Sequence, residues 1–270
     1  MLDVAIATHT PAGIERVARQ NLPKMHGVRY VVSWQSHEGA GVPGSLLQRS
    51  DIDIYRFDAE GQSANRNNAL RHCTGDIILI ADDDVTYTAR GLGALMDIFD
   101  ADGDIDLVTF IGNNYPGRKF PSEPVAFSRR LPRHYHVCGI EIAFRRSAAP
   151  EAAFCTELGL NSPRLHGGED EMFLLSAMRR GLRCKFFPVE VCRHRGESTG
   201  SKSRLSDANL RAAGCVMTLT YPATAILRLP LKAWRVSAKG QSGFFRALYH
   251  LAAGMAAAPG VWRRNRASLW

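Results

Sequence analysis

The sequence lacks the features that mark disulfide-rich, zinc-binding and repetitive proteins. Its six cysteines include no CxxC pair and no zinc-ligand spacing, so we expect reduced thiols that pack as small apolar side chains. No positively charged leader precedes the first apolar run, and neither an internal repeat nor a low-complexity tract is present. We therefore expect a protein that stays in the cytoplasm, without a disulfide framework.

Acidic residues are almost absent from the last part of the chain. Residues 201–270 contain eleven lysines and arginines but only one acid, Asp207. The whole chain of 270 residues has 34 basic and 26 acidic residues, which leaves 23 basic and 25 acidic residues for positions 1–200. The sequence thus predicts a near-neutral domain over 1–200 and a basic extension over 201–270.

The domain begins with apolar segments that alternate with segments suited to amphipathic helices, which is typical of βαβ units. We interpret residues 1–112 as a doubly wound, nucleotide-binding half of the domain, with residues 113–200 as its second half. The strands expected in the first half are 3–7, 29–34, 53–57, 76–81 and 107–111, and the expected helices are 12–22, 64–72 and 89–99.

The pattern becomes less regular after residue 112. Four prolines and clustered basic residues over 113–135 predict an irregular segment that could cover a substrate. Beyond it we expect a strand over 139–145, a helix over 169–180 that stops at Gly181, and a strand over 183–187.

Three acids, Asp82, Asp83 and Asp84, follow the apolar run 77–81. They therefore sit at the carboxyl end of a buried strand, where open α/β sheets place ligands. Carboxylates two residues apart in an extended turn can divide the work, one accepting ribose hydrogen bonds and one holding a divalent cation that bridges two phosphates. Magnesium or manganese suits such oxygen ligands. A solvated acidic turn is the alternative that the triplet alone leaves open.

Two helix starts carry further candidates. Gly61 and Ser63 precede a helix whose first turns contain Arg66, and a cation there suits an anionic ligand, although such an arginine can also simply face solvent. Gly167 and Gly168 precede a second helix that opens with the three acids 169–171. The helix dipole favours acids at that position in any protein, but a carboxylate there can also act as a general base.

The order and spacing of these motifs, with a histidine at 194, resemble family 2 of the inverting GT-A glycosyltransferases over residues 2–194. The resemblance implies one α/β domain with a Rossmann-like, doubly wound mixed sheet, in which residues 113–200 form the acceptor half. It also implies transfer of a sugar from a nucleotide-diphosphate sugar with inversion at the anomeric carbon. The acceptor that it implies is a glycan or a lipid-linked molecule, in cell-envelope or exported polysaccharide synthesis.

The family pattern also implies roles for individual residues. Asp84 would bind Mn²⁺ or Mg²⁺ bridging the diphosphate, and His194 matches a histidine that some members place on the metal or the diphosphate. Asp170 is implied as the catalytic base, with Glu169 steering the acceptor or donor sugar. The residues implied in nucleotide and donor binding are Thr8, Arg66, Asp82 and Asp83. Of these, Asp82 would contact the ribose.

The sequence departs from the family pattern in two places. The family commonly has an acid that reads a uracil edge after the second strand, whereas here that stretch is Val-Ser-Trp-Gln-Ser. The amide of Gln35 can pair with a pyrimidine edge, so Gln35 is a nucleotide-binding candidate, but a uridine donor does not follow. Pro11 and Ala12 also stand near the place where many members carry an arginine.

The basic extension contains two apolar runs, 219–231 and 244–262, each interrupted by arginine. Because the second run includes Arg246, His250 and Pro259, we expect it to lie in the interface of an anionic membrane rather than to cross it. The protein would then be peripheral on the inner face of the membrane. A helical cap with a solvated basic face is the alternative. No nucleic-acid-binding module is recognisable.

Other classes of protein share parts of this pattern. Residues 82–86 also spell the D-x-D-x-T motif of aspartyl-phosphate phosphatases, in which the first Asp is the nucleophile. That class requires the motif on the first strand, whereas three expected strands precede it here. Nucleotidyltransferases of similar fold need a glycine-rich signature near the start, which residues 8–13 do not provide. A non-catalytic sugar-binding or scaffold protein is disfavoured by the presence of metal-binding acids and a candidate base.

Overall fold

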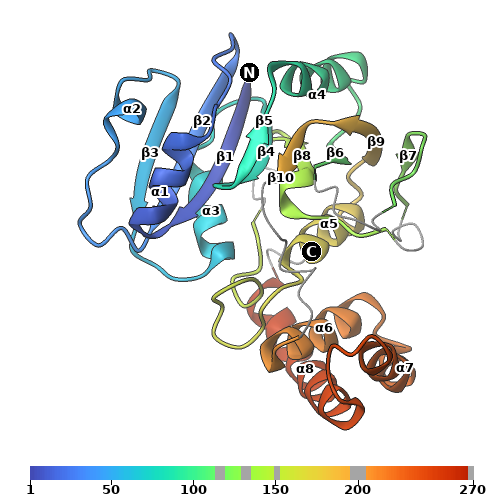
Figure 1. The fold of residues 1–270 in the computed structure, drawn as a ribbon. Coiled ribbons are helices and arrows are strands. Elements are labelled where there is room, and N and C mark those ends of the chain that lie inside the picture. The colour runs from blue at the N-terminus through green and yellow to red at the C-terminus, as the bar shows by residue number, and fades with distance from the viewer. Residues whose placement is uncertain (113–118, 129–134, 149–152, 195–204, 267–270) are drawn as a thin grey trace. The chain divides into compact units, whose positions relative to one another are not determined.

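The computed structural model describes residues 1–112, 119–128, 135–148, 153–194 and 205–266. The chain forms two compact units (Figure 1). Unit 1 comprises Met1–Glu60, Ala64–Ala153 and Leu174–Gly196, and unit 2 comprises Gly61–Ser63, Phe154–Phe173 and Glu197–Trp270.

The main sheet of unit 1 has eight strands in the order β3-β2-β1-β4-β8-β6-β9-β7. Its first four members are parallel, so their carboxyl ends meet at one edge. These strands are β1 (Leu2–His9), β2 (Val28–Gln35), β3 (Ile52–Phe57) and β4 (Ile77–Asp82). All four were predicted from their apolar runs, and each lies within about two residues of its expected bounds.

The helices of the first half follow the expected alternation with the strands. They are α1 (Thr10–Arg19), the short α2 (Gly44–Leu47), α3 (Gln62–His72) and α4 (Ala89–Ala101). α1 starts two residues earlier than expected, because Pro11 lies in its first turn, where a helix needs no N–H donor. Helix α2 was not predicted.

The second half makes the sheet mixed, as predicted. β8 (Ile142–Arg145) runs antiparallel between β4 and β6 (Leu107–Ile111), while β9 (Cys184–Glu190) is parallel to β6 and β7 (Val125–Ala126) is antiparallel to β9. The expected helix 169–180 is present as α5 (Glu169–Arg179). Of the irregular segment expected over 113–135, residues 113–118 and 129–134 lie outside the described residues.

The strand expected over 139–145 is wrong in its first half, where Gly139–Glu141 forms a 3₁₀ turn instead. The cause is the buried carboxylate of Glu141. It accepts hydrogen bonds from the backbone N–H groups of Gly112, at 3.3 Å, and Cys138, at 3.0 Å. Such a capping arrangement bends the chain before β8 can begin.

A second, two-stranded sheet pairs β5 (Val85–Tyr87) with β10 (Cys192–His194) in antiparallel fashion. Strands this short carry too little periodicity to be predicted as a pair. Their register places His194 opposite Val85, the residue that follows the acidic triplet. The pairing therefore joins two parts of the chain that the sequence analysis treated separately.

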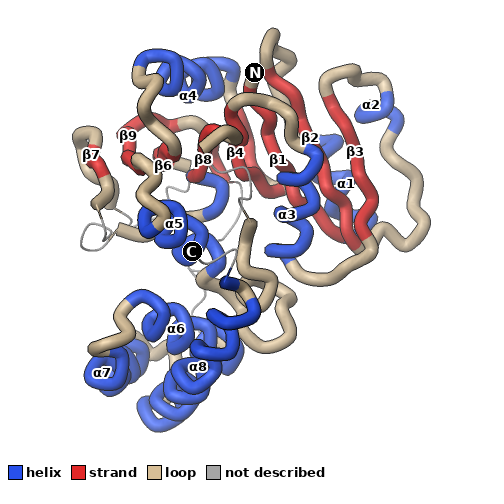
Figure 2. The backbone as a smooth tube through the Cα atoms, turned by 180° about the vertical axis from the view of Figure 1, so that it is seen from behind, coloured by secondary structure: helices blue, strands red, loops and turns tan. Residues whose placement is uncertain are grey.

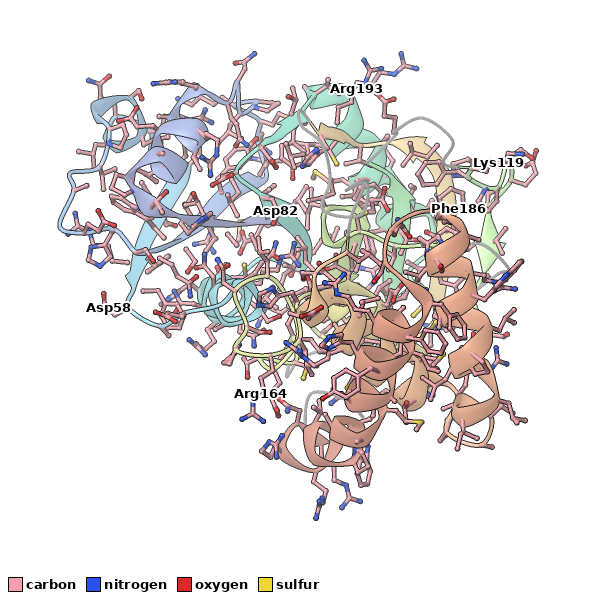
Figure 3. The ribbon with its side chains drawn as sticks, turned by 60° about the horizontal axis from the view of Figure 1, so that its bottom comes forward. Asp58, Asp82, Lys119, Arg164, Phe186 and Arg193 are labelled. Carbon is pink, nitrogen blue, oxygen red and sulfur yellow. The ribbon has the colours of Figure 1, made fainter. Side chains whose placement is uncertain are left out.

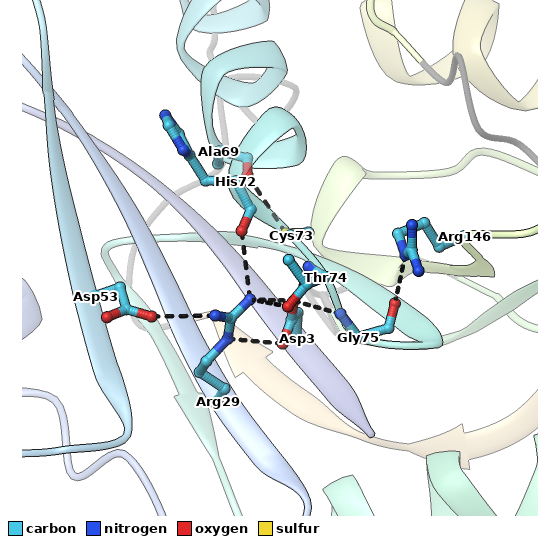
Figure 4. Close-up of polar contacts among 9 residues, drawn as sticks. All are labelled: Asp3, Arg29, Asp53, Ala69, His72, Cys73, Thr74, Gly75 and Arg146. Atoms are coloured by element: carbon cyan, nitrogen blue, oxygen red, sulfur yellow. Dashed lines mark hydrogen bonds and ion pairs between the residues drawn. The ribbon is translucent and has the colours of Figure 1, made fainter.

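The amino ends of the parallel strands are fixed by Asp3, which is fully buried (Figure 4). Its carboxylate accepts hydrogen bonds from Arg29, at 2.7 and 3.1 Å, and from the backbone N–H groups of Thr74 and Gly75, at 2.7 and 2.8 Å. Arg29 also reaches Asp53 on β3 at 3.2 Å. This network ties β1, β2, β3 and the start of β4 together, which fixes the relative positions of their carboxyl ends.

Unit 2 contains the helices α6 (Asp207–Thr220), α7 (Ala225–Ala238) and α8 (Phe244–Arg264), which pack together (Figures 1 and 2). α6 and α8 cross so closely that a Cβ on Gly214 would lie 2.0 Å from the carbonyl oxygen of Leu251. The run expected over 244–262 coincides with α8, whereas the run 219–231 is split between α6 and α7. None of the helices in the described part of the chain is long and apolar enough to cross a membrane.

Candidate donor and metal site

The acidic triplet lies at the carboxyl edge of the parallel strands. Asp82 is the last residue of β4 (Figure 3) and pairs with Ala7 of β1. Thr8 of β1 and Asp83, the residue after β4, are therefore neighbours. The expected location of the triplet at the ligand-binding edge of an open α/β sheet is thus observed.

Asp83 is held inside the protein. Its carboxylate accepts a hydrogen bond from the hydroxyl of Thr8 at 2.5 Å and two from Arg16, from Nε at 3.0 Å and from a terminal nitrogen at 2.8 Å. Burial raises the pKa of Asp83, and the bonds from Arg16 and Thr8 oppose that shift. This geometry fixes the β1–α1 loop against the triplet and commits both oxygens of Asp83 to protein donors.

Sequence reasoning missed Arg16. Many members of the family carry an arginine near the positions of Pro11 and Ala12, but the side chain that reaches the triplet here comes from the second turn of α1. The available signal was that α1 leaves the strand adjacent to β4, so a long cation on its inner side can reach back to the acids. Asn65 was also missed; its amide donates to the carbonyl oxygen of Thr8 at 2.7 Å.

Asp82 pairs with the predicted Arg66. One terminal nitrogen of Arg66 lies 3.0 Å from Oδ1 and 3.1 Å from Oδ2 of Asp82. The Arg66 side chain is only 3% exposed, whereas that of Asp82 is 24% exposed. Arg66 therefore does not face solvent, and Asp82 keeps an open side toward the edge of the sheet.

Asp84 and His194 are brought together by the small sheet. Because His194 pairs with Val85, its Nε2 lies 3.0 Å from Oδ2 of Asp84. The other carboxylate oxygen, Oδ1, is buried and has no hydrogen-bond partner among the described residues. Burial tends to raise the pKa of Asp84, but the hydrogen bond and charge of His194 outweigh it and lower the pKa, which keeps the group ionised.

This pair fits a divalent cation that is shared with a bound diphosphate. The unpartnered Oδ1 of Asp84 is a hard anionic ligand, and the imidazole of His194, next to the other oxygen of that carboxylate, offers a nitrogen ligand. Within the described ranges no group of three or more His, Cys, Asp or Glu side chains could hold a metal ion. The donor set is therefore too small for an all-protein cage and suits Mg²⁺ or Mn²⁺, which complete their coordination with water and substrate phosphates.

The charges of the side chains at the site nearly balance. Asp82, Asp83 and Asp84 contribute three carboxylates, while Arg16 and Arg66 contribute two guanidinium groups. With His194 in the neutral form that a metal ligand requires, one negative charge remains before any cation binds. A divalent cation would reverse that sign and make the edge attractive to a diphosphate.

Gln35, the candidate for the nucleotide base, ends β2 opposite His9 of β1. It is buried, and its amide nitrogen donates to the carbonyl oxygen of Ala59 at 2.5 Å. That nitrogen is thus engaged with the backbone at the end of β3.

The candidate base belongs to unit 2, at the start of α5. Gly167 and Gly168 have φ angles of 116° and 83°, which favour glycine, and a Cβ on Gly168 would lie 2.5 Å from Val216 of α6. The pair thus serves a turn and close packing. Glu169 is buried beside Gly159, while Asp170 is half-buried.

Comparison with known proteins identifies the fold. Residues 44–149 match the model of glycosyl transferase family 2, and no curated protein matches the chain. The crystal structure of S. aureus TarS is 14% identical with a TM-score of 0.58, covering 86% of this chain and 42% of TarS, so the chain spans under half of that protein.

Two further structures cover nearly the whole chain. The structure of S. aureus TarS 1–349 in complex with UDP is 14% identical with a TM-score of 0.57, covering 99% of this chain and 88% of that one. A mannosyltransferase from Pyrobaculum calidifontis, in complex with GDP-Man and Mn²⁺, is 18% identical with a TM-score of 0.52, covering 96% of this chain and 75% of that one. The chain therefore has the GT-A fold that its motifs predicted.

Proposed function

We propose that this glycosyltransferase, whose residues 44–149 match the model of glycosyl transferase family 2, is metal-dependent and uses a nucleotide-diphosphate sugar as donor. The sugar would pass to a hydroxyl of a glycan or lipid-linked acceptor. The observation that carries the proposal is the Asp84–His194 pair, with its buried, unpartnered carboxylate oxygen at the edge of the sheet.

The donor is held by residues at the ends of β1 and β4. Asp82, positioned by Arg66, presents a carboxylate that can accept hydrogen bonds from the ribose hydroxyls, and the backbone of Thr8 lies beside it. Mn²⁺ or Mg²⁺ held by Asp84 and His194 would neutralise the diphosphate as it departs. Asp83 acts by positioning, since Thr8 and Arg16 occupy both of its oxygens.

The transfer step is a single displacement. The acceptor oxygen forms a bond to the anomeric carbon as the bond from that carbon to the diphosphate oxygen breaks, so the configuration inverts. Asp170 takes the proton of the acceptor hydroxyl, and Glu169 orients the sugars. Removing such a base costs typically about 10²–10⁴ in rate.

The candidate bases of the donor nucleotide are uracil and guanine. Similar structures contain UDP-GlcNAc in one case and GDP-Man in another. Gln35 would read the base through its side-chain carbonyl oxygen, because its amide nitrogen already donates to Ala59. A donor panel should therefore include both nucleotide classes.

We also place the reaction at the inner face of a membrane, in cell-envelope or exported polysaccharide synthesis. The support is the basic extension, with eleven lysines and arginines and one acid over 201–270. An anionic membrane surface attracts such a segment with about 1 kcal/mol per basic residue. A lipid-linked acceptor would then be concentrated near the site.

The test is nucleoside diphosphate release from UDP- and GDP-sugars with Mn²⁺ or Mg²⁺. We expect Asp84→Ala to abolish metal-stimulated release, Asp170→Asn to reduce transfer while donor binding persists, and Asp100→Ala, an exposed acid on α4, to leave both unchanged. Hydrolysis of simple phosphate esters that requires Asp82 would instead support a phosphatase. Nucleoside diphosphate release that is the same in the wild type and in all three variants would refute the proposed site.

A further inference from the structure

Helix α7 has two apolar faces, whereas a surface helix of a globular protein has one. Its first face is buried in unit 2 and consists of Ala225, Leu229, Ala233 and Val236, at helical spacings of four, four and three residues. A second set of large apolar side chains on the same helix faces solvent. We call this set the apolar patch; it comprises Ile226 (66% exposed), Leu227 (74%), Leu231 (47%) and Trp234 (60%).

The apolar patch is part of an uneven distribution over the molecule. Ten large hydrophobic side chains are exposed among the described residues, and seven of them lie between positions 221 and 249. Besides the patch these include Phe245 and Tyr249, one turn apart on α8, at 83% and 70% exposure. A concentration of this kind marks an interaction surface rather than the scattered apolar residues of an ordinary exterior.

A row of cations borders the apolar patch. We call four cations the basic row: Arg228, Lys232 and Arg235 of α7, and Lys239, which caps its C-terminus. Their spacings of four, three and four residues place them on one side of the helix. No aspartate or glutamate occurs over residues 225–266. Arg246 and Arg264 pair with Asp207 and Glu157, but no carboxylate of the described residues lies within 4.0 Å of the basic row.

We propose that α7 is an interfacial helix whose apolar patch enters the headgroup boundary of an anionic lipid bilayer while its basic row contacts the lipid phosphates. Apolar, aromatic and cationic side chains in this arrangement are typical of helices that lie in a membrane surface. A second copy of the chain is a poor alternative, because a two-fold interface through the patch would bring the two basic rows together. With 14 residues, α7 is about 21 Å long and lies in the surface rather than crossing it.

The inference rests on the membrane location proposed above and names the surface that produces it. Its test uses no sugar donor, so its failure would leave the transferase reaction untouched. The full chain is sedimented with vesicles of phosphatidylcholine alone or of phosphatidylcholine with phosphatidylglycerol. We expect binding to the anionic vesicles that weakens as salt is added.

Two sets of variants separate the charge from the apolar contribution. Replacing Lys232, Arg235 and Lys239 by Gln should weaken partitioning on the order of 100-fold. The control replaces Arg19, Lys24 and Arg90 by Gln; these are also exposed and remove the same charge from unit 1. That control should bind like the wild type.

The apolar contribution is tested by Trp234→Ser with Leu227→Ser, against Leu47→Ser, which alters a side chain of α2 that is 70% exposed. The double variant should bind about tenfold or more weakly, and the control should be unchanged. Because these side chains are exposed, circular dichroism should show all variants folded. Equal vesicle binding by variants and controls would overturn the proposal. So would a wild-type dimer that becomes monomeric in the double variant, since the patch would then bind a second copy.

Discussion

Gly13 offers a sharp test of how the acidic triplet is held. It lies in the interior of α1, where alanine normally stabilises a helix by about 1 kcal/mol relative to glycine. Here a Cβ would lie 2.3 Å from the hydroxyl oxygen of Thr8 and 2.9 Å from Oδ2 of Asp83. We therefore expect Gly13→Ala to reverse the usual effect.

The magnitude follows from the bond that must break. To admit the new methyl group, the Thr8 side chain has to rotate, which removes its hydrogen bond to the buried carboxylate of Asp83. A bond to a charged group is worth about 1.5–3 kcal/mol, and the helix gain of about 1 kcal/mol offsets part of it. The net expectation is a loss of about 0.5–2 kcal/mol in unfolding free energy. Donor affinity should fall as well, because Asp83 lies between Asp82 and Asp84.

Urea denaturation of Gly13→Ala and Gly93→Ala measures the difference. Gly93 is in the interior of α4, and its Cβ would meet nothing within 4 Å. Gly93→Ala should therefore raise the unfolding free energy by up to about 1 kcal/mol. If Gly13→Ala stabilises the protein as Gly93→Ala does, the close packing of Thr8 and Asp83 against α1 is refuted.

Three further predictions concern the rest of the fold. Asp3→Ala leaves two backbone N–H groups and Arg29 without their acceptor, so urea denaturation should show that the unfolding free energy falls by about 3–5 kcal/mol. A much smaller fall would contradict the role of Asp3 in fixing the strand ends. The hydrogen bond from Arg264 lowers the pKa of Glu157, and it outweighs burial, which would raise that pKa. The ion pair therefore stabilises the folded protein above the ordinary pKa of 4.5, and this stabilisation is lost as pH falls through the lower pKa of the folded state. The Tm difference between wild type and Glu157→Gln should accordingly shrink in acid, and a constant difference would argue against the ion pair. Burial raises the pKa of Cys215 to about 12, so alkylation at neutral pH should modify it only after unfolding, and rapid modification of the native protein would contradict its burial.

Much of the fold follows from local sequence signals. The runs 77–81 and 107–111 are long and apolar enough to define buried strands, and their alternation with helices predicts a parallel sheet with its ligand edge at the triplet. This reasoning located Asp82, Asp83, Asp84 and Arg66 correctly relative to the strands. It depends only on periodicity, which short-range sequence carries well.

The pairings that complete the site do not follow from local signals. Strands β5 and β10 have three residues each and are over 100 positions apart, yet their register alone brings His194 to Asp84. Arg16 likewise reaches Asp83 only through the packing of α1 on the sheet. The 3₁₀ turn at 139–141 was mistaken for a strand, since the capping role of Glu141 depends on N–H groups that tertiary structure brings to it.

The two apolar faces of α7 also could not be distinguished from local sequence signals. The sequence indicates a mixed apolar and basic segment, but only the packing of Leu229 and Ala233 in unit 2 shows which apolar residues remain for another surface. The run 219–231, taken as one segment, is divided by the turn at Tyr221. A turn that contains Pro222 is a signal that could have divided it.

The central claim is that Asp84 and His194 hold a metal ion through which the donor diphosphate binds. Calorimetric titration of UDP and GDP into the protein, with Mn²⁺ and then with excess chelator, tests it most directly, using Asp84→Ala and the exposed control Asp100→Ala. The account predicts nucleotide binding that requires Mn²⁺, is lost in Asp84→Ala and persists in Asp100→Ala. Equal binding with chelator present, or undiminished binding by Asp84→Ala, would contradict it.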